Sequence, residues 1–399
     1  MRCRVKLSIR RIFLVTLHGA AVVLLCSWYT ELSPFRPEPS SSKVHVLLLS
    51  SWRSGSSFLG QVFSQHPSVF YLMEPTWHVW KTLQKAGMQV IQMAVRDLLQ
   101  SIFQCDFSVM ETYLPKHPKV SNLFSWRQSR ALCSQPACPL MPHHQISNAT
   151  RCKKDCDAWG LQLVQEACST YSHVVLKVVR IFELESLYPL LQDPSLDLRI
   201  IHLVRDPRAV LRSREALKKN LRRDNTIVLE QRNIPATDVQ YQVMQEICRS
   251  HVHIHNGAVL NPPPFLEGRY KMVRYEDVAR NPIEEINAIY EFVGLELTPE
   301  LEGWIYHMTH GKVKGKGAFK ITSRNATDVS RAWRSTLSHN KVKQVQEVCE
   351  GAMTLLGYKT VNSEEEQKRL DIDLLVDKTR WRVRTSQEKL SQVLDQKSN

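Results

Sequence analysis

Short apolar segments alternate with longer segments of helical periodicity along most of the chain. Runs rich in Val, Ile and Leu predict strands, and apolar residues that recur every three or four positions predict helices. The helical pattern is clearest over 88–103 and 282–293. The predicted strands are 44–49, 173–178, 199–204 and 269–274. This alternation indicates an α/β fold with three layers and a mainly parallel central sheet.

The N-terminal segment differs from this pattern. Basic residues precede an apolar run over 12–28, which is near the lower end of the ~17–25 residues that span a bilayer. The run ends at the aromatic pair Trp28 and Tyr29, and no small-residue cleavage site follows. A cleaved signal peptide is the alternative to a membrane anchor. We expect a cytoplasmic tail, a transmembrane signal anchor, a Pro- and Ser-rich stem and a lumenal domain at 1–11, 12–29, 30–43 and 44–399, respectively.

The cysteines agree with a lumenal domain. Leaving aside Cys3 and Cys26, eight of the ten cysteines lie beyond the predicted anchor, an even number that suits disulfides in an oxidising compartment. Zinc binding is the alternative, but the spacings within 133–156 differ from the C-x2-C pattern of zinc sites. Spacing alone does not reveal which cysteines pair. Sequons at Asn148 and Asn325 are candidate N-glycosylation sites.

Charge narrows the class of ligand only slightly. The 399-residue chain has a net charge of +14 and a pI of about 9.3, which suits anionic ligands, nucleic acid or a membrane surface. The sequence has no zinc-finger spacing, no RNP motif and no basic run interleaved with aromatic residues. We therefore expect no nucleic-acid partner.

The first predicted strand leads into a loop of small residues and then into a helical pattern, over 44–65. A strand–loop–helix junction of this kind binds phosphate-like groups through backbone N–H groups and the helix dipole. The loop differs from the triphosphate-binding pattern G-x-x-x-x-G-K-[ST], because the lysine is missing and Arg53 precedes Gly55. It predicts a site for an anionic nucleotide without triphosphate and magnesium chemistry.

A second junction follows the predicted strand 199–204. Asp206 suits a helix N-cap and Pro207 the first helical position, so Arg205 is expected at the carboxyl end of a strand, where α/β sheets bind ligands. Ser213 lies about two helical turns beyond Asp206 and returns to the same face. A guanidinium and a hydroxyl that converge here would bind a monophosphate. The alternative is a solvated basic helix end, because three further arginines follow: Arg208, Arg212 and Arg214.

Two anion sites at strand–loop–helix junctions point to a ligand with two separate phosphate-type groups. Adenosine 3'-phosphate 5'-phosphosulfate, also called 3'-phosphoadenylyl sulfate, is such a ligand. Its transferable sulfuryl group carries one negative charge and needs no divalent metal. We therefore expect this molecule as co-substrate and no metal.

Six motifs extend over nearly the whole predicted lumenal domain: VHVLLLSSWRSGSSF, FYLMEPTWHVW, TYSHVVLK, IIHLVRDPRAVLRSRE, VRYEDVARNP and SRNATDVSRAWR. In these motifs the chain resembles the Golgi carbohydrate sulfotransferases of the galactose/N-acetylglucosamine/N-acetylgalactosamine 6-O-sulfotransferase family, and most closely an N-acetylglucosamine 6-O-sulfotransferase. The resemblance implies a P-loop-like α/β sulfotransferase domain on a type II Golgi anchor. It implies a 5'-phosphosulfate loop of Trp52, Arg53, Ser54, Gly55, Ser56, Ser57 and Phe58. It also implies a 3'-phosphate site of Arg205, Asp206, Pro207, Arg208, Ala209, Val210, Leu211, Arg212 and Ser213.

The sequence departs from its relatives at two places. Val178 stands where relatives carry a glutamate, which removes one candidate base, and His307 stands where relatives carry a sequon asparagine. The remaining carboxylate candidate is Glu74, which precedes Pro75 and follows an apolar stretch. The resemblance also makes Glu74 the catalytic base. The alternative for Glu74 is an N-cap of the helix that follows.

Several other side chains are candidates for the site. Arg53 is expected to stabilise charge on the bridging oxygen and the 5'-phosphate in the transition state. Lys177 and Arg180 are expected to contact acceptor or nucleotide, or to be structural at the sheet edge. Trp77, His78 and Trp80 are expected either to stack on a sugar or to belong to the core. Trp333 and Arg334 are expected near the nucleotide. His45, His173 and His202 are expected to be core residues.

The expected reaction is transfer of sulfate to the 6-hydroxyl of N-acetylglucosamine in glycoprotein, mucin-type or keratan glycans. The alternatives are transfer to galactose or N-acetylgalactosamine, a metal-dependent glycosyltransferase with D-x-D motifs at 155–157 and 371–373, a nucleotide kinase, and a non-catalytic lectin. The expected partners are glycan acceptors and the Golgi membrane, and a homodimer is left open. A capping box of Ser363 and Glu366 predicts a C-terminal helix packed on the domain.

Overall fold

The computed structural model describes residues 43–139, 142, 149–312 and 322–378. The chain divides into two units, 1–42 and 43–399, and the described residues belong to the second. The predicted tail and anchor, the stem up to residue 42, and Asn148 lie outside them. Within the described ranges no helix is both long and apolar enough to cross a bilayer.

The described domain is built around a parallel sheet of five strands in the order β2-β3-β1-β4-β5. The strands are β1 (Val44–Ser50), β2 (Val69–Met73), β3 (His173–Val178), β4 (Asp197–Val204) and β5 (Tyr270–Arg274). The four predicted strands are confirmed to within two residues at each end. β2 is not among the predicted strands, because its short run of buried apolar residues has no alternating pattern to distinguish it.

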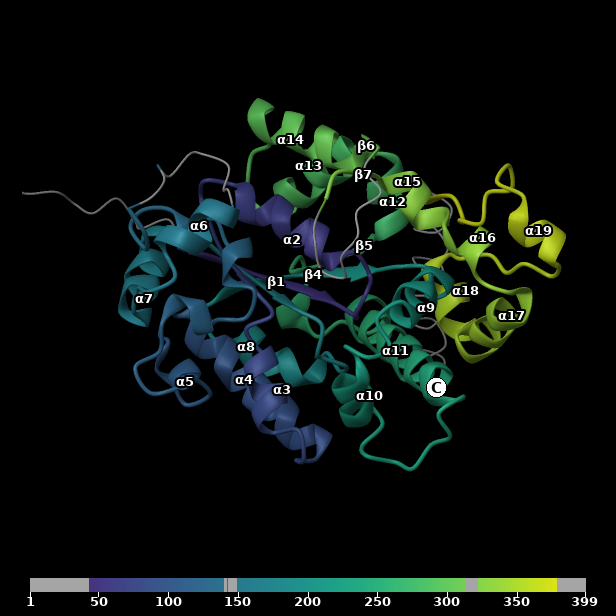
Figure 1. Cartoon of the computed structure of the whole chain (residues 1–399), viewed down its shortest axis with the longest axis horizontal. Coiled ribbons are helices and arrows are strands. Elements are labelled where there is room, and N and C mark those ends of the chain that lie inside the picture. The colour runs from purple at the N-terminus through teal and green to yellow at the C-terminus, as the bar shows by residue number, and fades with distance from the viewer. Residues whose placement is uncertain (1–42, 140–141, 143–148, 313–321, 379–399) are drawn as a thin grey trace, which may run out of the picture. The chain divides into compact units, whose positions relative to one another are not determined.

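Helices cover both faces of the sheet, as Figure 1 shows, so the three-layer prediction is confirmed. Alternate residues of β1 face opposite cores: Leu47 and Leu49 belong to one apolar cluster, Val46 and Leu48 to the other. The first cluster includes residues of α4 (Met88–Phe103), α7 (Leu161–Thr170), α8 (Tyr188–Gln192), α10 (Arg222–Val228), α11 (Val239–His255), α17 (His339–Val348) and α18 (Glu350–Leu356). The second includes residues of α2 (Ser56–Gln65), α12 (Tyr275–Arg280), α13 (Pro282–Val293) and α14 (Pro299–Thr309).

Short elements complete the domain. α3 (Trp77–Thr82) and α9 (Pro207–Glu215) follow β2 and β4. A small antiparallel pair, β6 (His310–Lys312) and β7 (Arg324–Asn325), leads into α15 (Ala326–Arg331). The other short helices are α5 (Ser108–Glu111), α6 (Ala149–Asp155), α16 (Trp333–Thr336) and α19 (Glu364–Lys368).

All eight cysteines beyond the predicted anchor are paired, so the prediction of disulfides is confirmed. The pairs are Cys105–Cys168, Cys133–Cys152, Cys138–Cys156 and Cys248–Cys349. The structure thus supplies the connectivity that spacing left open. In the described part of the chain, no group of three or more His, Cys, Asp or Glu residues could hold a metal ion.

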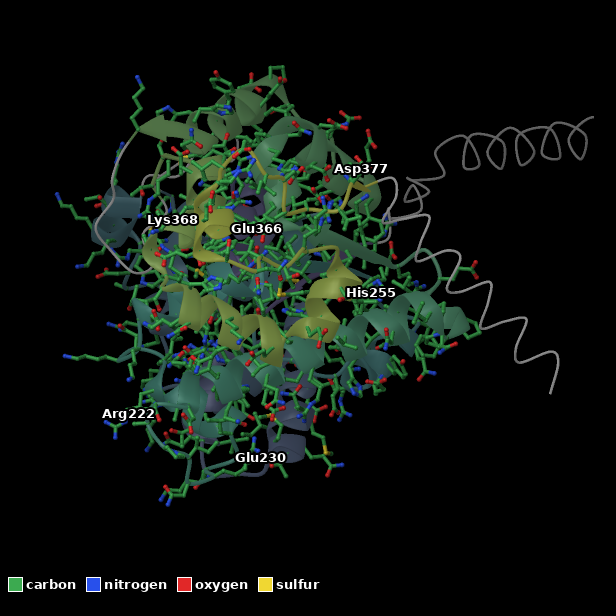
Figure 2. All side chains as sticks on the ribbon, turned by 90° about the vertical axis from the view of Figure 1, so that its right-hand side faces the viewer. Arg222, Glu230, His255, Glu366, Lys368 and Asp377 are labelled. Atoms are coloured by element: carbon green, nitrogen blue, oxygen red, sulfur yellow. A yellow bond between two sulfur atoms is a disulfide. The ribbon has the colours of Figure 1, made fainter. Side chains whose placement is uncertain are left out.

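The predicted C-terminal helix is shorter than expected. Its N-cap is Ser363, whose Oγ accepts a hydrogen bond from the backbone N–H of Glu366 at 3.1 Å, and α19 ends at Lys368. Figure 2 shows Glu366 and Lys368 on this helix. The apolar segment after it is not helical, because Leu375 forms a bridge with Tyr358 and is buried there. The 371–373 D-x-D motif therefore lies outside any helix.

Candidate active site

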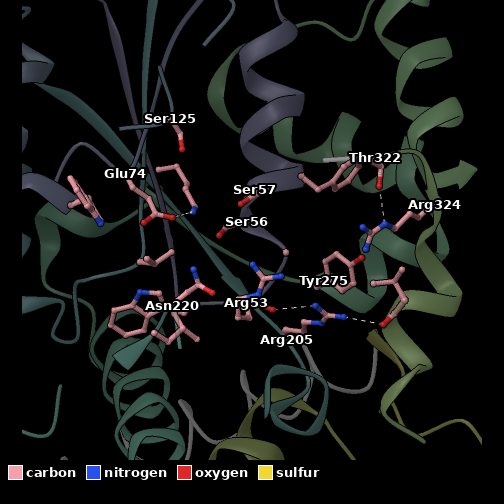
Figure 3. Close-up of a pocket in the computed structure, with 18 of the residues that line it drawn as sticks. Arg53, Ser56, Ser57, Glu74, Ser125, Arg205, Asn220, Tyr275, Thr322 and Arg324 are labelled. Carbon is pink, nitrogen blue, oxygen red and sulfur yellow. Dashed lines mark hydrogen bonds and ion pairs between the residues drawn. The ribbon is translucent and has the colours of Figure 1, made fainter. Parts of the chain in front are cut away.

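A cavity of about 460 Å³ lies where the strands of the main sheet end. Its lining residues follow all five strands at their carboxyl ends: the 52–58 loop after β1, Glu74 after β2, Arg180 after β3, Arg205 after β4 and Tyr275 after β5. Parallel α/β sheets bind their ligands at this edge. The first predicted anion loop, Arg205 of the second and the predicted base Glu74 therefore face one cavity (Figure 3), whereas residues 206–213 of the second site do not line it.

The loop after β1 has a conformation that requires glycine at position 55. Gly55 has φ +91°, and a Cβ there would lie 2.3 Å from a ring carbon of Tyr275. α2 begins at Ser56, and no acidic residue occupies its first turn. The first N–H groups of a helix have no partner within the helix and, with the helix dipole, favour an anion. The loop residues that line the cavity are Trp52, Arg53, Gly55, Ser56, Ser57 and Phe58.

Arg53 and Arg205 join the two predicted anion sites. Arg53 Nε donates to Ser213 Oγ at 2.9 Å, and Arg205 Nη1 donates to the backbone carbonyl of Arg53 at 3.1 Å. The Arg205 guanidinium also lies 4.4 Å from the ring centre of Tyr275. Burial, followed by the charge of Arg205, lowers the pKa of Arg53 to about 10, so Arg53 stays cationic at neutral pH. The predicted return of Ser213 to this face is confirmed by its bond to Arg53.

Residues 206–212 of the second motif are structural: they support Arg205 and do not face the cavity. Asp206 caps α9 by accepting from the backbone N–H of Arg208, and it forms a buried ion pair with that guanidinium at 2.8 Å. Arg208 also lies 4.2 Å from the ring centre of Trp333. Because Arg208 and Arg214 are fully buried, the alternative of a solvated basic helix end is wrong for both. Pro207, Ala209, Val210 and Leu211 are buried, and Arg212 Nε donates to Thr336 Oγ1.

A hydrogen-bonded chain of buried side chains supports the first loop. Ser54 Oγ lies 2.7 Å from Ser51 Oγ, which lies 3.2 Å from His251 Nε2. His251 Nδ1 contacts His202 Nε2 at 2.8 Å, and His202 Nδ1 contacts the Tyr270 hydroxyl at 2.7 Å. Burial lowers the pKa of His251 to about 4, so the ring is neutral at physiological pH. His202 is thus a core histidine, as predicted, and Ser54 belongs to the loop's support.

Glu74 is held as a carboxylate between two cations. Its two oxygens form ion pairs with Lys177 and Arg180, and its backbone N–H donates to the Lys177 carbonyl at 2.9 Å. Burial alone would raise the pKa of Glu74, but the charges and hydrogen bonds of Lys177 and Arg180 lower it to about 2. The N-cap alternative is wrong, because Thr76 occupies that position of α3. Lys177 and Arg180 both line the cavity.

Three cavity residues other than glycine adopt the left-handed backbone conformation. Arg53 has φ 73°, Glu74 has φ 49° and Ser125 has φ 51°. Such conformations cost about 1–3 kcal/mol each and concentrate at functional sites. Their presence on three separate segments around one cavity supports a functional assignment.

Comparison with known proteins agrees with this geometry. Residues 43–357 match the family described as a sulfotransferase domain. The chain belongs to the sulfotransferase family. It is 54% identical over 360 residues to carbohydrate sulfotransferase 6 of Homo sapiens, covering 90% of this chain and 91% of that protein.

Two further relatives give the same result. Carbohydrate sulfotransferase 5 of Homo sapiens is 56% identical over 349 residues, covering 86% of this chain and 85% of that protein. Carbohydrate sulfotransferase 4 of Mus musculus is 50% identical over 341 residues, covering 85% of this chain and 88% of that protein. The resemblance to the carbohydrate sulfotransferases predicted from the motifs is therefore confirmed.

The structure adds residues that the sequence did not indicate. Tyr275 of this sulfotransferase follows β5 directly, so the rule that ligands bind at strand ends could have found it. Arg324 lies within the SRNAT motif, but its place in the cavity depends on the β6–β7 pair. Asn220 and Asp224 come from the segment after α9 and carry no sequence signal.

Some candidates lie elsewhere. Trp333 and Arg334 do not line this cavity: Trp333 packs against Arg208, and Arg334 donates to the carbonyls of Arg369 and Ile372. Val178 is fully buried in the apolar core. His78 and Trp80 are buried, as the core alternative predicted, whereas Trp77 lines the cavity.

Proposed function

We propose that this protein transfers the sulfuryl group of 3'-phosphoadenylyl sulfate to the 6-hydroxyl of N-acetylglucosamine in glycoprotein, mucin-type or keratan glycans. The observation that carries the proposal is the cavity that joins the 52–58 loop, Arg205 and Glu74. It offers the start of α2 with Arg53, and the guanidinium of Arg205, to a doubly charged nucleotide, with a carboxylate beside them. The names of the relatives, all carbohydrate sulfotransferases, support a sugar as acceptor.

The donor would lie along the line from the loop to Arg205. The start of α2 and Arg53 would bind the 5'-phosphosulfate, and Arg205, together with Ser213, which accepts from Arg53, would bind the 3'-phosphate. Because Arg205 donates a hydrogen bond to the backbone carbonyl of Arg53, a phosphate bound at one site would stabilise the conformation of the other. These groups supply positive charge without a metal ion, so we propose no metal requirement.

In the reaction, the sugar O6 attacks sulfur in line with the bond to the 5'-phosphate oxygen. The new O–S bond forms as the old S–O bond breaks, and its electron pair goes to the phosphate oxygen. Arg53 and the first N–H groups of α2 would stabilise the charge that develops there. Glu74 would take the proton of the 6-hydroxyl.

The ion pairs of Glu74 affect its strength as a general base. A pKa of about 2 keeps the carboxylate ionised and ready to accept a proton, but it also makes the group a weak base. An anionic donor bound beside Lys177 and Arg180 would compete for their charge. Its presence would raise the pKa of Glu74 and increase its basicity when the donor is in place.

The N-terminal sequence supports a single-pass type II Golgi enzyme with a lumenal catalytic domain. The basic 1–11 segment would remain cytosolic, and 12–29 would span the membrane. N-glycans on Asn148 and Asn325 would fit this topology. The side chain of Asn325 is exposed, and its oxygen caps α15 by accepting from the Asp328 N–H at 3.0 Å, which leaves the amide nitrogen available.

The test is a transfer assay with the full-length protein in detergent. The protein is incubated with sulfate-labelled donor, a chelator, and glycans that end in N-acetylglucosamine, galactose or N-acetylgalactosamine, and the sulfated position is read by mass spectrometry. We expect 6-O-sulfate on N-acetylglucosamine. Sulfate on galactose or N-acetylgalactosamine alone would replace the acceptor assignment, and no transfer to any sugar would refute the function.

A further inference from the structure

Two aromatic rings form one wall of the cavity beside Glu74. Trp77, at the start of α3, and Phe124, between two short 3-10 turns, stack with ring centres 4.9 Å apart and planes 24° apart. Both residues line the cavity and both are partly exposed. Most other aromatic residues around the site are buried, so these two present an apolar face to the cavity. We call this pair the aromatic platform.

The aromatic platform is fixed in relation to Glu74. The backbone N–H of Trp77 donates to the Glu74 carbonyl at 3.0 Å, so the indole is one turn from the proposed base. The backbone N–H of Phe124 donates to His78 Nε2 at 3.1 Å. Burial, followed by the charge of Lys81, lowers the pKa of His78 to about 4, so this nitrogen remains an acceptor at neutral pH. The two rings are therefore held by backbone bonds as well as by stacking.

Two polar side chains line the same cavity as the aromatic platform. Ser125 follows Phe124 in the chain, and Asn220 approaches from the turn after α9; both line the cavity. Figure 3 shows Ser125 on one side of Glu74 and Asn220 on the other, toward Arg53. Within the described ranges neither side chain has a hydrogen-bond partner, whereas Glu74 and Arg180 are fully paired. The cavity thus contains an apolar surface and two polar groups that a ligand can bind.

From this arrangement we infer that the aromatic platform binds the apolar face of the acceptor hexose, and that Asn220 recognises its 2-acetamido group. The inference rests on the proposed function. Aromatic walls with a few oriented polar groups are typical of sites for small ligands. The 6-hydroxyl projects from the ring on a rotatable bond, so the ring can stack on Trp77 while O6 reaches Glu74.

The choice of an acetamido sugar follows from the chemistry of Asn220. A carboxamide both donates and accepts, and it therefore complements the N–H and carbonyl of an acetamido group. A galactose acceptor has a single hydroxyl at this position and would leave part of the amide without a partner. A site built to bind a polar group discriminates against ligands that lack it.

The test compares variants of the full-length protein in the transfer assay. Trp77→Ala should raise the acceptor KM by about 10–100-fold, whereas the Kd for adenosine 3',5'-bisphosphate should stay within about twofold. Trp77→Phe should restore most of the acceptor affinity. Trp159→Ala, which removes an exposed tryptophan that does not line the cavity, is the matched control and should leave both constants unchanged.

Asn220→Ala tests the specificity. It should lower the ratio of kcat/KM for N-acetylglucosamine over galactose acceptors by about 10-fold, and Ser125→Ala should change this ratio less. The inference is overturned if Trp77→Ala leaves the acceptor KM unchanged, if it weakens nucleotide binding equally, or if Asn220→Ala leaves the ratio unchanged. Failure of the unmodified protein to sulfate any sugar would instead refute the proposed function itself.

Discussion

The guanidinium of Arg205 donates a hydrogen bond to the backbone carbonyl of Arg53, across 3.1 Å and between residues far apart in the chain. Arg53 in turn donates to Ser213, on the helix that follows Arg205. The two strand–loop–helix junctions are therefore linked by two hydrogen bonds, one donated from each. The two anion sites predicted separately from the sequence form a single structural unit, which suits a ligand that carries both charged groups.

Replacement of Arg205 by alanine should weaken donor binding strongly. The change removes a charged donor for the phosphate and frees the Arg53 carbonyl, and hydrogen bonds to charged groups contribute about 1.5–3 kcal/mol each. Calorimetry with adenosine 3',5'-bisphosphate should show a Kd raised by about 10–100-fold. Arg249→Ala is the matched control, because Arg249 is exposed and pairs with Glu246 on the surface. An unchanged Kd for Arg205→Ala would contradict this account.

Glu74→Gln should separate chemistry from binding. The amide keeps the size of the side chain but cannot take the proton, so kcat should fall by about 10²–10⁴-fold. The nucleotide Kd should change much less, because Glu74 is proposed to act on the acceptor hydroxyl and not on the nucleotide. The thermal midpoint must be measured in parallel, since the change leaves Lys177 and Arg180 short of one negative charge. Normal turnover by a folded variant would exclude Glu74 as the base.

Lys177→Met should move the acid limb of the activity profile to higher pH. Lys177 is the first of the charges that lower the pKa of Glu74, so its removal lets burial raise that pKa. A base must be deprotonated to act, so the variant should lose activity at acidic pH values where the unmodified enzyme remains active. Lys177→Arg retains the positive charge, so the acid limb of its activity profile should stay at the same pH. If the acid limb of Lys177→Met lies at the same pH as that of the unmodified enzyme, then the titration of Glu74 does not determine that limb.

Glu276→Gln should remove part of the pH dependence of stability. Glu276 accepts from the backbone N–H of Asp206 at 3.1 Å and from the Tyr358 hydroxyl at 2.9 Å. Burial, followed by the charge of Asp206, raises its pKa from 4.5 to about 7. The folded state therefore binds the proton more tightly than the unfolded state, and this contribution is full below pH 4.5 and lost as pH rises through 7.

The size of this effect follows from the two pKa values. The unfolding free energy of the unmodified protein should fall relative to that of Glu276→Gln by about 3 kcal/mol between about pH 4.5 and about pH 8. Glutamine can accept from Asp206 and donate to Tyr358, so it imitates the protonated acid. Denaturant unfolding of both proteins at several pH values measures the difference. Parallel curves would show that Glu276 does not titrate in this range.

The parts of the fold that depend on local chemistry were predictable. The apolar runs of β1 and β3 and the Asp206–Pro207 helix start are signals that a sequence carries within a few residues. The roles of Arg208 and Glu74, in contrast, depend on residues that are distant in the chain. Arg208 is buried because Gln346, distant in the chain, accepts from it at 3.0 Å, and Glu74 is ionised because the pairing of β2 with β3 brings Lys177 beside it. Such partners depend on the tertiary fold, so the sequence pattern did not reveal them.

The most direct measurement is a crystal structure of the protein with adenosine 3',5'-bisphosphate. We expect the 5'-phosphate within hydrogen-bonding distance of Arg53 and the start of α2, and the 3'-phosphate beside Arg205 and Ser213. A nucleotide bound elsewhere, with Ser57 and Ser213 both distant from its phosphates, would contradict this expectation.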